Sequence, residues 1–190
     1  RGFRGYNTDM PGLYRAMRAD GVRIEGERVL ILGAGGVARA VAVMLEEKGA
    51  QEIILLNRTP ERAQRIADEV NTLACRTVAR AAELGAYGDL PGGERYLAIQ
   101  ATSVGMHPHD EDVVIADEAF YKKIHTGYDL VFNPACTRFM QMTKEQGGRA
   151  FNGAKMLLYQ GIIAYEFWTG RQVSEADAEE VYAAMKMAMR

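Results

Sequence analysis

Apolar runs alternate with helical patterns along this chain, which predicts an open α/β sheet. Four runs have the composition of buried strands, residues 29–32, 52–56, 96–101 and 128–132, and weaker strands are expected at 76–78 and 149–151. Helices are predicted between them at residues 9–19, 37–48, 60–70, 79–84, 117–124 and 137–146. This alternation is typical of a Rossmann-like, doubly wound parallel sheet.

The pattern changes after Gly153. Apolar residues cover nearly every side of the segment 156–168, which predicts a helix buried all round, and a last helix follows Ser174. We therefore divide the chain into residues 1–152, a lead-in helix with a Rossmann-like domain, and residues 153–190, the C-terminal helices.

A glycine turn joins the first buried strand to its helix. It consists of Gly33, Ala34, Gly35, Gly36, Val37 and Ala38. Gly33 permits a tight turn, Gly35 lets a pyrophosphate approach the backbone, and Ala38 lets the helix lie close to the strand. Free N–H groups at the helix start would face the phosphates. The surrounding strand and helix favour a dinucleotide site over an ordinary structural turn.

The end of the second strand bears on which nicotinamide cofactor binds. An NAD site usually carries an acid there, about 20 residues beyond the glycines, whereas this chain has Asn57. Arg58 and Arg62 can pair with a 2′-phosphate, and Thr59 with the start of the next helix completes an anion site. The pattern favours NADP; the alternative is that both arginines are solvated helix residues.

Composition removes several classes of partner. A formal net charge of −2 at pH 7 gives no reason to expect nucleic acid or an anionic membrane. Without an apolar run that spans a bilayer, a cytoplasmic protein is the default expectation. Cys75 and Cys136 lie far apart, and His107 and His109 lack the spacing of metal ligands, so neither a disulfide nor a metal site is expected.

Five stretches, in order, resemble shikimate dehydrogenase. They are residues 5–9 (Gly-Tyr-Asn-Thr-Asp), 33–40, 57–59, 101–106 (Ala-Thr-Ser-Val-Gly-Met) and 153–160. The resemblance implies an NADP-dependent enzyme of the route to chorismate and the aromatic amino acids, which interconverts 3-dehydroshikimate and shikimate. In that family a hydride moves from nicotinamide to the ring ketone, and a lysine–aspartate pair handles the proton.

The resemblance also assigns roles to single residues. Asp9 matches the catalytic aspartate, which contacts substrate hydroxyls, although a helix N-cap is an equally good explanation of it. Gln160 matches a substrate-binding glutamine, and Phe132 stands where a tyrosine often reaches the substrate. The residues matching positions beside the cofactor are Thr102, Ser103, Met106, Leu130, Gly153 and Met156.

Some positions depart from the family pattern. Gln100 replaces the usual asparagine before Ala-Thr-Ser, and Phe132 lacks the hydroxyl. Lys155 occupies a position where the family commonly has a small residue, and it is expected to alter the nicotinamide edge. Phe132 and Lys155 leave room for a quinate/shikimate dehydrogenase as an alternative function. A non-catalytic module that uses the same glycine turn to bind a dinucleotide is an alternative of a different class.

The family's N-terminal substrate lobe, with its catalytic lysine, has no counterpart in this sequence. We therefore expect the cofactor-binding portion of a two-lobed enzyme, inactive or nearly so on its own. The helices after Gly153 are expected to pack on that lobe and, without it, to expose an apolar patch or to self-associate.

Overall fold

The computed structural model describes residues 2, 5–91 and 93–188. Contacts divide the chain into two compact units: unit 1 comprises Arg1–Val22 and Gly153–Arg190, and unit 2 comprises Arg23–Asn152.

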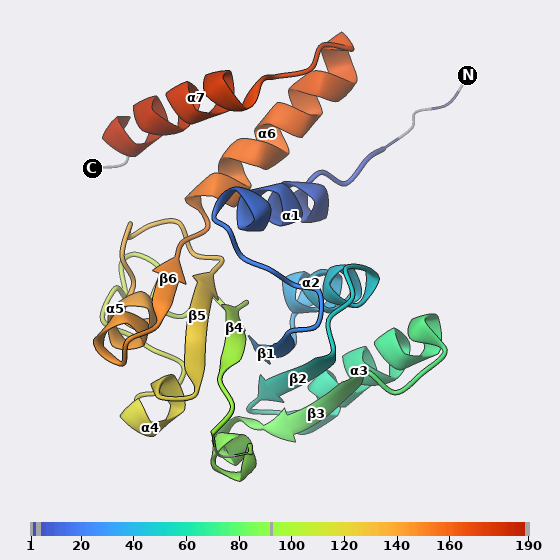
Figure 1. The fold of residues 1–190 in the computed structure, drawn as a ribbon, viewed down its shortest axis with the longest axis vertical. Helices are drawn as coiled ribbons and strands as arrows, with labels where there is room; N and C mark the ends of the chain where they lie inside the picture. The colour runs from blue at the N-terminus through green and yellow to red at the C-terminus, as the bar shows by residue number, and fades with distance from the viewer. Residues whose placement is uncertain (1, 3–4, 92, 189–190) are drawn as a thin grey trace. The chain divides into compact units, whose positions relative to one another are not determined.

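Unit 2 is built on a parallel six-stranded sheet. Its elements are β1 (Arg28–Leu32), α2 (Gly36–Glu47), β2 (Glu52–Asn57), α3 (Pro60–Ala74), β3 (Ala79–Glu83), the 3₁₀ helix η1 (Leu84–Asp89), β4 (Tyr96–Gln100), α4 (Glu118–Tyr121), β5 (Ile124–Asp129), α5 (Arg138–Glu145) and β6 (Arg149–Phe151). The strand order is β3-β2-β1-β4-β5-β6 (Figure 1). This confirms the predicted α/β, Rossmann-like doubly wound fold.

The central strands are buried on both faces, as their continuous apolar sequences predict. Alternate residues of β1 such as Leu30 and Leu32 join a core cluster with Phe139 and Met140 of α5. On the other side, α2 and α3 contact β1, β2 and β3. Burial on both faces is what makes a parallel sheet stable, and it leaves the strand ends as the places where ligands can reach it.

The helix predicted at residues 79–84 is wrong. Ala79–Glu83 is strand β3, which pairs in parallel with β2. Alanine favours helices, but the ladder with β2 outweighs this weak preference. The Asn71 side chain also accepts hydrogen bonds from the N–H groups of Val78 and Ala79, both at 2.8 Å, and so ties the start of the strand to α3.

The strand predicted at residues 128–132 begins and ends too late. Strand β5 is Ile124–Asp129, and the expected helix before it shrinks to α4. The start of the strand was not predicted because His125, Thr126 and Gly127 lack the apolar pattern of a buried strand. Gly127 is required there because a Cβ atom would lie 2.9 Å from the ring of Phe139.

Unit 1 contains α1 (Asp9–Ala19), α6 (Ala154–Thr169) and α7 (Glu175–Ala188). Helices α1 and α6 approach closely at Gly12, where a Cβ atom would lie 2.7 Å from the backbone nitrogen of Gln160. The lead-in helix thus packs with the C-terminal helices, whereas the division drawn from the sequence grouped it with the Rossmann-like domain.

Helix α6 is not buried on all sides within the described residues. Ala154, Leu158, Tyr159 and Ile162 form its buried side. Toward its C-terminal end, by contrast, Phe167 is 55% exposed and Trp168 is 84% exposed. Its sequence is therefore more apolar than its surroundings in this structure require.

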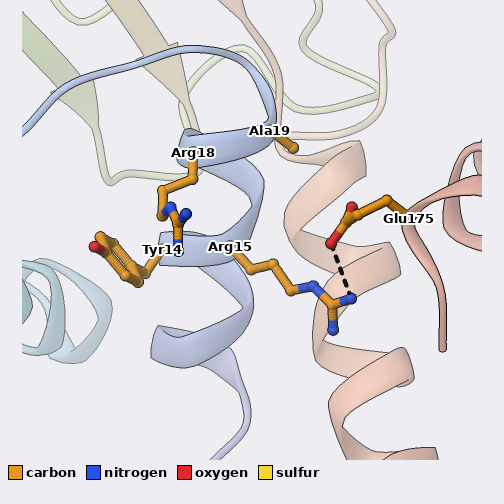
Figure 2. A pocket seen from close by; sticks show the side chains of 5 residues that line it. All are labelled: Tyr14, Arg15, Arg18, Ala19 and Glu175. Atoms are coloured by element: carbon orange, nitrogen blue, oxygen red, sulfur yellow. Dashed lines mark hydrogen bonds and ion pairs between the residues drawn. The ribbon is translucent and has the colours of Figure 1, made fainter. Parts of the chain in front are cut away.

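Ion pairs hold the three helices of unit 1 together. Arg15 of α1 lines a cavity of about 490 Å³ with Tyr14, Arg18, Ala19 and Glu175. Figure 2 shows Arg15 pointing toward Glu175, at 3.1 Å, and Arg15 also pairs with Glu166 of α6 at 3.3 Å. Because its guanidinium is already bonded to two carboxylates of the same unit, Arg15 acts here as a structural residue.

Lys155, like Arg15, forms ion pairs with two carboxylates of unit 1. Its ammonium lies 3.0 Å from Asp20 and 3.5 Å from Glu179. These ion pairs tie α6 to the end of α1 and to α7, and an effect of Lys155 on the nicotinamide edge stays a prediction.

Candidate functional site

A cavity of about 290 Å³ opens at the carboxyl ends of β1, β2 and β4 in unit 2. It is lined by Gly33, Leu56, Asn57, Arg58, Leu84, Thr102, Ser103, Val104, Val113 and Val114. Strand order reverses between β1 and β4, which is where open α/β sheets bind ligands. Its lining combines apolar side chains with amide, hydroxyl and guanidinium groups.

Gly33 connects the three strand ends. Its φ of +110° is strained for residues with a side chain. Its N–H donates to the carbonyl oxygen of Leu56 at 2.9 Å. A Cβ atom would lie 2.8 Å from Cγ2 of Thr102 and 3.2 Å from the carbonyl oxygen of Ala101. Only glycine therefore fits between β1 and the loop after β4.

The start of α2 is open to an anion. Gly35 is its N-cap without a side-chain cap bond, and the first turn carries no acidic residue. A Cβ atom on Gly35 or Gly36 would meet no protein atom within 4 Å, so space is left beside the backbone. Ala38 is fully buried, which keeps the helix close to the sheet. Free N–H groups and the helix dipole favour a phosphate there.

The end of β2 supplies two of the polar residues that line the cavity. Asn57 and Arg58 line it, and Nδ2 of Asn57 donates to the carbonyl oxygen of Thr59 at 2.9 Å. Arg58, Thr59 and Arg62 are exposed. This turn therefore presents side-chain donors to an incoming anion and has no carboxylate at position 57.

Gln100 organises the loop after β4. Its side chain is 1% exposed. Its Oε1 accepts hydrogen bonds from the backbone nitrogen and Oγ1 of Thr102 at 2.6 and 2.7 Å. Its Nε2 donates to the carbonyl oxygen of Val104 at 2.9 Å and to Oδ1 of Asp129 at 3.3 Å. One amide thus fixes both ends of the loop that carries Thr102 and Ser103.

Asp129 is a buried carboxyl group that the sequence analysis missed. It accepts hydrogen bonds from the backbone nitrogen of Val131 at 2.9 Å and from Oγ1 of Thr137 at 2.6 Å. Burial raises its pKa to about 6, although the bonds from Thr137 and Val131 act in the opposite direction. The sequence did contain a signal for this residue, because Asp129 is a charged residue inside the apolar run 128–132.

The raised pKa of Asp129 predicts a pH dependence of stability. As pH rises from about 4 to about 6, the unfolded chain releases this proton before the folded chain does. The free energy of unfolding should therefore fall across that window, by about 3 kcal/mol for a shift of about two units. Asp129→Asn should remove this contribution, as measured by urea unfolding at several pH values.

A control distinguishes this effect from general acid sensitivity. The hydrogen bond from Tyr87 lowers the pKa of the exposed Asp117, so Asp117→Asn should change the pH slope in the opposite sense. Parallel stability curves for the wild type and Asp129→Asn would contradict the prediction.

Several residues proposed for the cofactor or substrate contacts do not line this cavity. Met106 and Phe132 are 44% and 40% exposed on the loops after β4 and β5. The N–H of Leu130 donates to the carbonyl oxygen of Gln100 at 3.0 Å. Gly153 and Met156 belong to unit 1. The cofactor contacts of Met106, Leu130, Gly153 and Met156 stay predictions, as does the substrate contact of Phe132. The apolar lining residues Leu84, Val104, Val113 and Val114 were not predicted at all.

The two proposed substrate residues of unit 1 lie on helices that pack together. Asp9 is the first residue of α1 and Thr8 is the N-cap, so the suggestion that Asp9 caps the helix is wrong. Its backbone nitrogen donates to Oδ1 of Asn7 at 2.9 Å, and its side chain is exposed. Asp9 precedes Gly12, which abuts Gln160, by one helical turn. Their substrate roles stay predictions.

Other kinds of site find little support. Among the described residues, no group of three or more His, Cys, Asp or Glu side chains is placed to hold a metal ion. Within the same residues, no helix has the length and apolar character needed to cross a membrane.

Two family models match the chain. The model described as shikimate/quinate 5-dehydrogenase matches residues 16–90, and the model described as the shikimate 5′-dehydrogenase C-terminal domain matches residues 153–190. The chain belongs to the shikimate dehydrogenase family. The first of these matches contains the glycine turn and Asn57 to Arg62, and the second contains Gln160.

Individual members of the family agree with this assignment. A shikimate dehydrogenase (NADP(+)) of Carboxydothermus hydrogenoformans is 39% identical over 168 residues, which are 87% of this chain and 58% of that protein. Shikimate 5-dehydrogenase of Thermus thermophilus, solved with NADP(H) and shikimate, has a TM-score of 0.77 at 32% identity, over 95% of this chain and 63% of that one.

A quinate dehydrogenase of Corynebacterium glutamicum, solved with NAD, has a TM-score of 0.80 at 25% identity over 95% of this chain and 63% of that one. The chain thus spans about three fifths of the length of the relatives it matches.

Proposed function

We propose that unit 2 binds NADP in its cavity, and that the chain is the cofactor-binding portion of an NADP-dependent shikimate dehydrogenase. The observation that carries the proposal is the cavity at the switch point of the sheet, which Gly33 helps to line, together with the start of α2 that follows Gly33 in the chain and has no side-chain cap. The named NADP-dependent relatives and the absence of an acid at Asn57 support the choice of NADP.

The residues present fit the parts of this cofactor. The N–H groups at the start of α2 would hold the pyrophosphate, and Arg58 with Arg62 would hold the 2′-phosphate. The apolar lining residues Leu84 and Val113 suit the adenine ring, because burying an aromatic face against them removes apolar area from water. When bound, NADPH supplies the hydride for reduction of a ketone.

Unit 1 would supply the substrate contacts. Asp9 would take part in proton transfer and bind substrate hydroxyls, and the Gln160 amide would bind a further hydroxyl. Lys155 is committed to Asp20 and Glu179, so it is not the lysine partner of Asp9. We therefore propose that the 190-residue chain alone reduces 3-dehydroshikimate slowly or not at all, and that a substrate lobe completes the site.

The exposed aromatic end of α6 supports packing against such a lobe or self-association. A cytoplasmic location also stays a prediction. Quinate/shikimate dehydrogenase is the second candidate, favoured by the structural similarity to quinate dehydrogenase. Comparing quinate with shikimate oxidation by the enzyme with its substrate lobe would separate the two.

Calorimetric titration of the chain with NADP and with NAD, followed by shikimate, tests the proposed function. We expect tight binding of NADP, weak binding of NAD and no shikimate heat. A chain that is folded by circular dichroism yet binds neither dinucleotide would refute the proposal. Tight NADP binding together with rapid turnover of 3-dehydroshikimate would instead refute the need for another lobe.

A further inference from the structure

The loop after β4 forms one wall of the cavity, and its conformation depends on a single buried side chain. Thr102, Ser103 and Val104 all line the cavity. Gln100 bonds both the start of this segment, at Thr102, and its end, at the carbonyl oxygen of Val104. Oγ1 of Thr102 also accepts a hydrogen bond from the backbone nitrogen of Val104 at 3.1 Å. The loop is thus closed on itself around one amide.

The amide of Gln100 is in turn held by the buried carboxyl group of Asp129. Its Nε2 donates to Oδ1 of Asp129, and the same carboxyl group binds the N–H of Val131 and the hydroxyl of Thr137. Thr137 caps α5 by accepting from the backbone nitrogen of Met140 at 3.3 Å. The loop at the cavity is therefore anchored to β5 and to the start of α5, two elements outside the cavity.

The length of the side chain matters for this arrangement. All of the bonds of Gln100 are between 2.6 and 3.3 Å, and its partners lie on both sides of the amide. The family's usual asparagine is shorter by one methylene, so on this backbone we expect it to lose the bond to Thr102 or the bond to Asp129. Because each of these groups is buried or half-buried, a lost bond leaves an unsatisfied polar group that the loop must move to solvate.

We propose that Gln100 is a positioning residue for the dinucleotide: anchored on Asp129, it holds the loop 101–104 in the conformation that contacts the bound cofactor. This role rests on the proposed NADP binding in the cavity. Gln100 itself touches no part of the cavity surface, so it acts through Thr102 and Val104.

The experiment compares Gln100→Asn with Thr143→Val. Thr143 is a fully buried polar residue of the same unit. Among the described residues its hydroxyl bonds the carbonyl oxygen of Phe139 alone, so its loss destabilises unit 2 without touching the loop. We expect Gln100→Asn to raise the Kd for NADP about tenfold, the effect of one or two lost hydrogen bonds. Thr143→Val should stay within about twofold of the wild type at a comparable drop in melting temperature.

Hydrogen exchange rates of single amides distinguish a local change in the loop from a general loss of stability. The N–H of Thr102 and of Val104 should exchange faster in Gln100→Asn, while amides of β1 and β2 change no more than in Thr143→Val. Equal Kd values for the wild type and Gln100→Asn, or equal weakening by both variants, would overturn the inference. A folded wild type that binds no dinucleotide would overturn the proposed function instead, and the exchange data would then decide the role of Gln100 in the loop.

Discussion

Gly33→Ala is expected to abolish measurable NADP binding and to destabilise unit 2 by about 2 to 4 kcal/mol. A Cβ atom at φ +110° is strained, and it would also lie 2.8 Å from Cγ2 of Thr102 and 3.2 Å from the backbone of Ala101. Relief of that overlap requires β1 and the loop after β4 to separate, which opens the cavity. Urea unfolding and calorimetry with NADP measure the two effects.

Gly35→Ala is the matched control, because it adds the same methyl group at a place with no protein neighbour. Gly35 has a φ of −91°, which alanine adopts without strain, and a Cβ atom there meets nothing within 4 Å. Its stability should equal that of the wild type, whereas NADP binding should weaken by about 100-fold, since the methyl group occupies space proposed for the pyrophosphate. Unchanged NADP affinity in Gly35→Ala would place the phosphates elsewhere.

The double variant Arg58→Ala/Arg62→Ala is expected to raise the Kd for NADP by about 10- to 100-fold and that for NAD by less than about threefold. Each guanidinium would lose a charge-assisted hydrogen bond to the 2′-phosphate, a group that NAD lacks. Both side chains are exposed, so little stability depends on them. Parallel titrations with the two cofactors give the ratio of affinities directly.

A third exposed arginine controls for the loss of positive charge. Arg76 follows the far end of α3, and Arg76→Ala should leave both affinities within about twofold of the wild type. If the double variant loses affinity equally for NADP and NAD, the two arginines bind a group that both cofactors contain, and the assignment to the 2′-phosphate is wrong.

The fold was predictable where the sequence is locally unambiguous. Strands β1, β2 and β4 are nearly continuous apolar runs, which predict buried strands directly. The turn at Gly33 was predictable because a tight turn at this place requires glycine. Prediction failed at β3 and at the start of β5. There alanine or polar residues form strands only because a neighbouring strand pairs with them, and that neighbour is distant in the sequence.

The same distinction applies to the candidate site. Gly33, Asn57, Arg58, Thr102 and Ser103 were predicted and do line one cavity. Asp129 and the apolar residues Leu84, Val113 and Val114 were not, because their significance depends on which chain segments lie beside them. A buried carboxyl group in an apolar run was a usable signal, but its partners Gln100 and Thr137 are identified only by the three-dimensional structure.

The two parts of unit 1 stand at opposite ends of the described chain, and this affects the order of folding. Helix α1 can meet α6 only after the ends of residues 23–152 have been brought together. Closing so long a flexible loop costs about 4 kcal/mol in chain entropy, a cost largely met once the intervening sheet has formed. We therefore expect unit 2 to fold first and α1–α6 docking to follow. A break in the backbone anywhere in unit 2 would turn that docking into an encounter between separate chains.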